Sequence, residues 1–216
     1  RVYDRDIGEF ITRARQVPML INYSVGKQRF EKEPDEYDLE LIRKIEESAV
    51  PYWYPTDRMP EGDESRRNDP LGITHVHHFY TKRNLWLLSC LYHHGKKFLP
   101  LVLIFQSISA TLCSKLARYN LGNRGNGPVS GTLYIASLVA EANATKVFAG
   151  KIKDFKRALG LIKNVRDTLV SCNSTGNVML CDDSIDYIFT DPPFGGNLMY
   201  SELNFLWEAW LRVFTN

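Results

Sequence analysis

The sequence predicts an α/β fold in which a doubly wound sheet carries added helices. Residues 184–190 read SIDYIFT, a β-prone run that stops at Asp191-Pro192-Pro193. A helical pattern covers 143–165 before this run, and another begins at Tyr200 after it. Helix, strand, loop and helix in this order are typical of a doubly wound sheet. The chain has 216 residues, 44% of them hydrophobic, which is enough for one sizeable core.

The sequence predicts fewer helices and strands in the N-terminal part of the chain, up to residue 75, than in the rest. Residues 17–23 read as a short strand or extended stretch. Residues 37–48 predict a helix, because leucine and isoleucine recur there at helical spacing. Residues 50–75 are rich in Pro, Asp, Arg and Gly, so we expect a loop.

Two apolar helices are expected next, over 84–97 and 101–119. A glycine-rich loop follows at 120–131, and 132–135 predicts a short strand. The pattern over 143–165 predicts the clearest helix, with its lysines on the wet face. Trp207 and Trp210, in the last predicted helix, are expected in the core.

Composition excludes several classes of protein. The net charge is only +2, so any nucleic-acid surface has to be a local patch. The four cysteines form no C-x-x-C pair, which argues against a zinc ribbon and suits reduced thiols in a cytoplasmic protein. The longest apolar run, 98–105, is too short to span a membrane, and no signal peptide is visible. The chain begins with Arg1 rather than Met, so we expect it to be a piece of a longer protein.

The loop Asp191-Pro192-Pro193-Phe194 has the residue types that methylation of an aromatic amino group requires. The nitrogen lone pair of such a group is delocalised, and two hydrogen-bond acceptors can draw the nitrogen toward tetrahedral geometry. Asp191 offers a carboxylate, and the proline ring fixes the backbone so that the Pro192 carbonyl is aimed in advance. Phe194 offers a stacking face worth about 1–3 kcal/mol per base. A base inside a duplex would have to be flipped out.

This loop matches the Asp/Asn/Ser-Pro-Pro-aromatic signature of amino-group methyltransferases. The run SIDYIFTDPPFGGNLMYSELNFLWEAWL (184–211) resembles large bacterial and archaeal DNA methylases with adenine-specific methylase domains. Three more stretches resemble the same proteins in the same order: GDESRRND (62–69), ITHVHHFYTKRNLWLLS (73–89) and GPVSGTLYI (127–135). The resemblance covers most of the chain from about residue 17 onward.

The resemblance implies a Rossmann-like, S-adenosylmethionine-dependent methyltransferase fold and a site-specific DNA methyltransferase activity, in a bacterial modification or restriction setting. It implies Asp191 and the Pro192 carbonyl as amino-group acceptors within the catalytic loop 191–194, with Thr190, Asp191 and Asp183 near the cofactor. For Asp183, a plain turn is the competing interpretation.

The glycine-rich cofactor loop of such enzymes is absent from this chain, so the sheet is expected to be incomplete, with that loop before Arg1. We expect 1–216 to be a single methyltransferase domain or a fragment of one, in which 50–135 is an insertion that contributes to DNA binding.

Four basic residues are candidates for DNA contact: Arg118, Arg124, Lys82 and Arg83. Glycines around Arg118 and Arg124 permit close backbone approach, and arginine offers bidentate donors to phosphate. The competing interpretations are a plain surface loop for Arg118 and Arg124, and ion pairing with nearby acids for Lys82 and Arg83.

His75, His77 and His78 raise the question of a metal site. Alternating histidines can meet one ion, but no Cys, Asp or Glu lies within the run to complete a site. The sequence therefore favours a structural, substrate-near or nucleic-acid-contacting role, and we predict no metal.

Adenine N6 is favoured over cytosine N4 as the methylated atom, although the motif itself does not separate them. The first alternative is an RNA amino-methyltransferase, because similar loops serve guanine N2 in RNA. A second is a non-catalytic nucleic-acid-binding fragment. A third, methylation of a protein glutamine, would be expected to show Asn at position 191.

Overall fold

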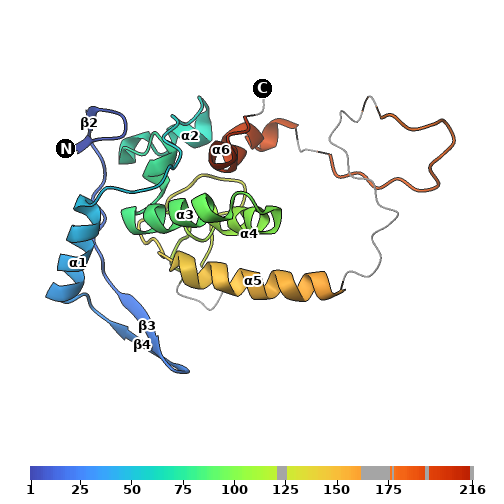
Figure 1. Cartoon of the computed structure of the whole chain (residues 1–216). Helices are drawn as coiled ribbons and strands as arrows, with labels where there is room; N and C mark the ends of the chain where they lie inside the picture. The colour runs from blue at the N-terminus through green and yellow to red at the C-terminus, as the bar shows by residue number, and fades with distance from the viewer. Residues whose placement is uncertain (121–125, 162–175, 177, 193–194, 215–216) are drawn as a thin grey trace.

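The computed structural model describes residues 1–120, 126–161, 176, 178–192 and 195–214. Helices form its body, two hairpins lie at its N-terminal side, and 178–192 leaves the body as an extended loop (Figure 1). The helical elements are α1 (Glu36–Glu47), α2 (Asp63–Arg66), η1 (Asp69–Leu71), η2 (Val76–Phe79), α3 (Lys82–Gly95), α4 (Leu99–Ser109), α5 (Ala144–Leu161), η3 (Gly195–Asn197) and α6 (Tyr200–Leu211).

Both sheets in the described part of the chain are two-stranded and antiparallel. Strand β1 (Val2–Asp4) pairs with β2 (Glu9–Ile11), and β3 (Ile21–Val25) pairs with β4 (Gln28–Lys32). The structure is therefore mixed α and β, with small sheets only. The predicted doubly wound sheet is not seen among these residues and stays a prediction.

Four predicted helices are confirmed as α1, α3, α5 and α6 within the described residues. The start of α1 shows why the chain turns helical there. The Asp35 side chain accepts from the Asp38 amide at 3.0 Å, and the Asp38 side chain accepts from the Asp35 amide at 3.1 Å. This reciprocal capping box satisfies two amide donors that the helix itself leaves free.

Three predicted elements are wrong in their bounds or type. Helix α4 ends at Ser109 rather than 119, because the chain turns there and the Lys115 amide donates to the Phe79 carbonyl at 2.7 Å. Residues 132–135 form no strand. The expected loop over 50–75 contains α2 and η1, although Pro and Gly do mark the irregular stretches between them.

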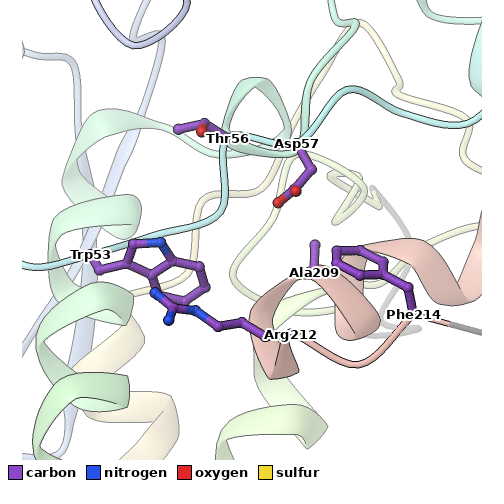
Figure 2. A pocket seen from close by; sticks show the side chains of 6 residues that line it. All are labelled: Trp53, Thr56, Asp57, Ala209, Arg212 and Phe214. Carbon is purple, nitrogen blue, oxygen red and sulfur yellow. The ribbon is translucent and has the colours of Figure 1, made fainter.

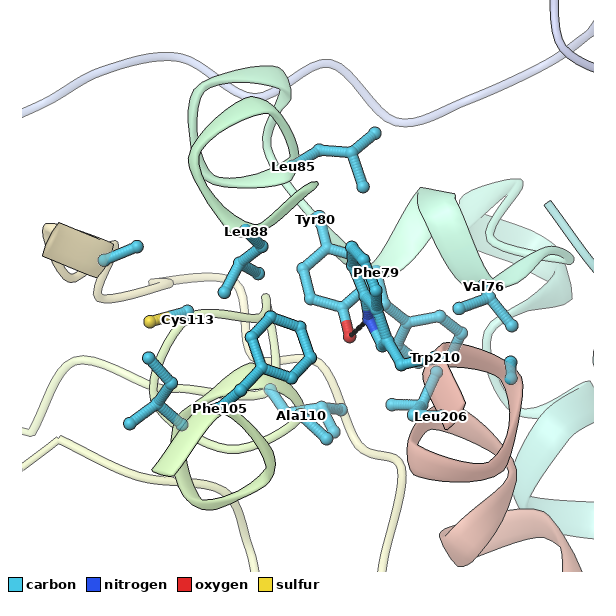
Figure 3. Packing of buried hydrophobic residues seen from close by; sticks show 14 of the residues in the cluster. Val76, Phe79, Tyr80, Leu85, Leu88, Phe105, Ala110, Cys113, Leu206 and Trp210 are labelled. Carbon is cyan, nitrogen blue, oxygen red and sulfur yellow. Dashed lines mark hydrogen bonds between the residues drawn. The ribbon is translucent and has the colours of Figure 1, made fainter. Parts of the chain in front are cut away.

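The core lies where α3, α4, α6 and η2 meet. Trp210 is at its centre, with the rings of Phe105 and Tyr80 at 5.1 and 6.0 Å between centroids. Its indole Nε1 donates to the Tyr80 hydroxyl at 3.0 Å, drawn as a dashed line in Figure 3. The prediction that Trp210 is a core residue is confirmed, and Trp207 packs against the same core.

A buried carboxylate joins α6 to α2. Glu202 is almost wholly inaccessible, and its Oε2 accepts from the Ser65 amide at 2.6 Å. A Cβ at Gly62 would stand 2.2 Å from the Glu202 carboxyl carbon, so a glycine is required there for space. A negative group at a helix N-terminus is favourable because the amide N–H groups there lack helical partners. The start of α6, just beyond the predicted catalytic loop, is therefore fixed to the body.

Candidate functional site

The predicted catalytic loop lies at the end of an exposed segment. Residues 178–192 are exposed throughout, and Figure 1 shows this stretch looping away from the helices. The predicted strand over 184–190 is wrong for the described structure, since no described strand lies beside it to complete a ladder. Its side chains Tyr187 and Phe189 are 81% and 80% exposed.

Within this segment, Thr190, Asp191 and Pro192 have no regular secondary structure and are exposed. Pro193 and Phe194 lie outside the described residues. Asp183 adopts a left-handed backbone with φ of 57° in a turn, which agrees with the plain-turn interpretation. Aspartate tolerates this conformation better than most residues.

The predicted nucleic-acid-binding residues differ in their exposure and in their ion pairs. Arg83 pairs with Glu141: its Nε donates to Oε1 at 2.9 Å, and its Nη2 contacts Oε2. Lys82 opens α3 and is half-buried, whereas Arg118 is exposed beside the glycine-rich loop. Arg124 lies outside the described residues. Arg118 is therefore the most accessible of these cations in the described structure, and the Glu141 pair gives Arg83 a structural role.

A shallow pocket of about 330 Å³ opens at the end of α6 (Figure 2). Trp53 and Phe214 form its two aromatic walls, and Ala209 lies between them. The guanidinium carbon of Arg212 lies 3.8 Å from the centroid of the Trp53 ring, and the Asp57 carboxylate faces the same space. None of the residues predicted as a site from the sequence lines this pocket.

A second group of functional side chains is buried between the N-terminal hairpin and η2. The Nε2 atoms of His77 and His78 lie 3.1 and 2.7 Å from Oδ2 of Asp4. The other Asp4 oxygen accepts from the Asp6 amide at 3.0 Å. The Tyr54 hydroxyl donates to Oδ1 of Asp6 at 2.8 Å. One carboxylate therefore joins two histidines to a strand more than seventy residues away.

The protonation of this cluster follows from its surroundings. Burial opposes ionisation of Asp4, but hydrogen bonds from His78 and His77 outweigh it and hold the Asp4 pKa well below its usual range. Burial, opposed by Asp4, lowers the pKa of His77 and lowers that of His78 to about 3. At neutral pH an ionised Asp4 therefore accepts N–H bonds from two neutral rings.

Sequence reasoning missed Asp4. The run 73–80 contains no acid, and nothing in the local spacing points to a residue 73 positions away. The acidic N-terminal stretch with Asp4 and Asp6 was a visible signal, but only tertiary packing brings it to the histidines.

Lys115 lies buried against η2. Its Nζ donates to the His78 carbonyl at 2.7 Å. Burial, with a contribution from Arg13, lowers the Lys115 pKa to about 7. The unfolded chain therefore binds this proton more tightly than the folded chain does between about pH 7 and 10.5, and stability contributed here rises with pH over that window.

We expect the Lys115→Met substitution to remove this dependence on pH. The difference in unfolding free energy between wild type and variant should change by up to about 1.4 kcal/mol per pH unit within the window, in favour of the variant at its acidic end. Urea unfolding of both proteins at pH 7, 8, 9 and 10 measures the difference, and other titrating groups cancel. If the unfolding free energies of the two proteins changed in parallel with pH, this would contradict a buried Lys115 that loses its proton over this window.

No protein-family model matches the chain, and neither curated proteins nor solved structures gave a match. None of the described helices has the length and apolar character needed to cross a membrane.

Proposed function

We propose that the protein transfers a methyl group from S-adenosylmethionine to an exocyclic amino group in DNA, with adenine N6 favoured. The observation that carries the proposal is the sequence Asp191-Pro192-Pro193-Phe194 within its wider resemblance to DNA methylases. Asp191 accepts one amino hydrogen and the Pro192 carbonyl the other, so that the nitrogen lone pair turns toward the sulfonium methyl. The accessibility of Asp191 is compatible with a bulky extruded nucleotide.

The exposed apolar run before Asp191 supports a packing partner for this segment. Ile185 is about half exposed and Ile188 and Phe189 are largely exposed, although each has a strong preference for a packed strand. Burying such side chains stabilises by about 25 cal/mol per Å² of apolar surface. We propose that neighbouring parallel strands cover this run and hold Asp191 at the sheet's carboxyl edge, where doubly wound folds bind their ligands.

The pocket beside Trp53 supports a nucleic-acid substrate. Trp53 and Phe214 are 39% and 47% exposed, so each ring leaves surface for contact with a base beside the face of Trp53 that Arg212 covers. Arg212 holds a positive charge against the indole, and the Asp57 carboxylate can accept from a base amino group. Aromatic faces interleaved with a cation are the usual composition of sites for unpaired nucleotides.

A methyl-transfer assay with the wild-type protein tests the proposal. Labelled methyl from S-adenosylmethionine should enter duplex DNA and be recovered as N6-methyladenine. Transfer to structured RNA instead would support the RNA alternative. Calorimetry with S-adenosylmethionine separates the remaining case: the absence of binding would indicate a non-catalytic nucleic-acid-binding module and contradict the proposal.

A further inference from the structure

The buried cluster around His77 has the donor set of a divalent-cation site. The ligand atoms of Asp4, His77 and His78 lie within 4.8 Å of one another, and all three residues are buried. They come from β1 and η2, so no local turn explains their meeting. A nitrogen donor beside carboxylate oxygens suits Zn²⁺, Mn²⁺ or Fe²⁺ among the biological divalent ions.

His78 is fixed as a hydrogen-bond donor rather than a ligand. Its Nδ1 accepts from the amides of Thr74 and His75 at 3.2 and 3.3 Å, so this nitrogen carries a lone pair. A neutral ring then has its proton on Nε2, which donates to Asp4 at 2.7 Å. Coordination through that nitrogen would move the ring proton to Nδ1, where it would face two amide donors. His78 therefore orients the Asp4 carboxylate from outside the coordination sphere.

His77 is under no such constraint. Its Nδ1 is buried and has no hydrogen-bond partner among the described residues. The ring can therefore carry its proton on Nδ1 at the cost of the Nε2 bond to Asp4 alone, and a metal ion bound by both of these atoms would replace that contact. A buried polar atom without a partner often marks a place where an ion or a water belongs.

Asp6 supplies the third donor. Its Oδ2 lies 3.9 Å from His77 Nε2, while Asp4 Oδ2 lies 3.1 Å from the same nitrogen. Donor atoms about 2.1 Å from a shared ion stand about 3.0–4.2 Å apart, depending on the angle between them. The Tyr54 hydroxyl holds Oδ1 of Asp6, so Oδ2 remains for the ion. The Asp6 side chain is 32% exposed, which gives the ion a route from solvent.

We propose that His77 Nε2, Asp4 and Asp6 bind one divalent transition-metal ion, with water in the remaining positions. His78 and Tyr54 hold the two carboxylates in place. The ion fastens the N-terminal hairpin to η2, in a region also tied by the Ala14 amide donating to the Leu71 carbonyl at 2.9 Å. The role is structural and independent of methyl transfer.

Titration calorimetry with Zn²⁺ on the wild-type protein, the Asp6→Asn variant and the His94→Ala variant tests the site. Asp6→Asn keeps an acceptor for Tyr54 and changes a partly exposed side chain, so it should fold normally. We expect it to weaken zinc binding to the hairpin site at least about tenfold. His94→Ala, which removes an exposed imidazole near Tyr52, should leave that binding unchanged. Equal affinity in Asp6→Asn and wild type, or loss of binding in His94→Ala, would overturn the proposal.

Histidine nitrogen NMR on the same chain gives a second test. Zinc should shift the His77 Nε2 resonance, while His78 keeps its Nε2 proton. Loss of the His78 proton to the metal, or no change at His77, contradicts this ligand set. Neither readout requires methyltransferase activity, so failure of the functional proposal would leave this result interpretable.

Discussion

Replacement of Asp191 by alanine is expected to reduce methyl transfer by the protein at least about 100-fold, the usual scale for loss of one positioned polar catalytic group. The side chain is exposed, so stability should hardly change. Asp191→Asn keeps an acceptor oxygen and should retain more activity than Asp191→Ala. Initial rates of labelled methyl transfer to DNA, set beside thermal unfolding midpoints, measure both effects.

Asp186→Ala is the matched control for this loss. Asp186 belongs to the same exposed segment, five positions before Asp191, and has no part in the proposed chemistry. The Asp186→Ala variant should transfer methyl groups at the wild-type rate. Equal rates for wild type and Asp191→Ala would remove Asp191 from the mechanism, whereas equal losses in both alanine variants would indicate a general effect on the segment.

Replacement of Trp210 by alanine should destabilise the fold by about 3–5 kcal/mol, the cost of removing a large aromatic side chain from a close-packed core. Trp210 is 1% exposed, and Phe105, Tyr92 and Tyr80 all pack around its ring. The truncation also leaves the Tyr80 hydroxyl without its indole donor. Urea unfolding followed by circular dichroism measures the loss.

Trp86→Ala provides the comparison, because Trp86 lies on α3 but is 40% exposed. Its loss should cost far less than the loss of Trp210, since much of its surface already contacts water. Similar costs for the two tryptophans would mean that α6 does not contribute the centre of the core.

Sequence periodicity was sufficient for the helices and for part of the core. The repeats that predicted α1, α3, α5 and α6 reflect one apolar face per helix, and the face of α6 correctly placed Trp210 inside. The end of α4 was not predictable in this way. The Lys115 amide bonds to a carbonyl thirty-six positions earlier, and no local pattern encodes that partner.

The β-prone run over 184–190 shows a second limit of local pattern. Strand preference expresses how well a residue fits a pleated, packed surface, and such a surface exists only when neighbouring strands are present. The described residues place no strand beside it, so the run is extended and exposed. The interpretation of Asp191 as catalytic depends on residue identity and context, and the described fold neither adds a contact to it nor removes one.

By itself, the sequence determined the amphipathic helices, the chemical character of the Asp191 loop and the histidine-rich run, because each is a property of neighbouring residues. Tertiary structure alone decided which distant groups meet. It buries Asp4 against His77 and His78, caps α2 with Glu202, and pairs Arg83 with Glu141. These contacts join residues 58 to 137 positions apart, and their partners are chosen by how the elements pack rather than by spacing along the chain.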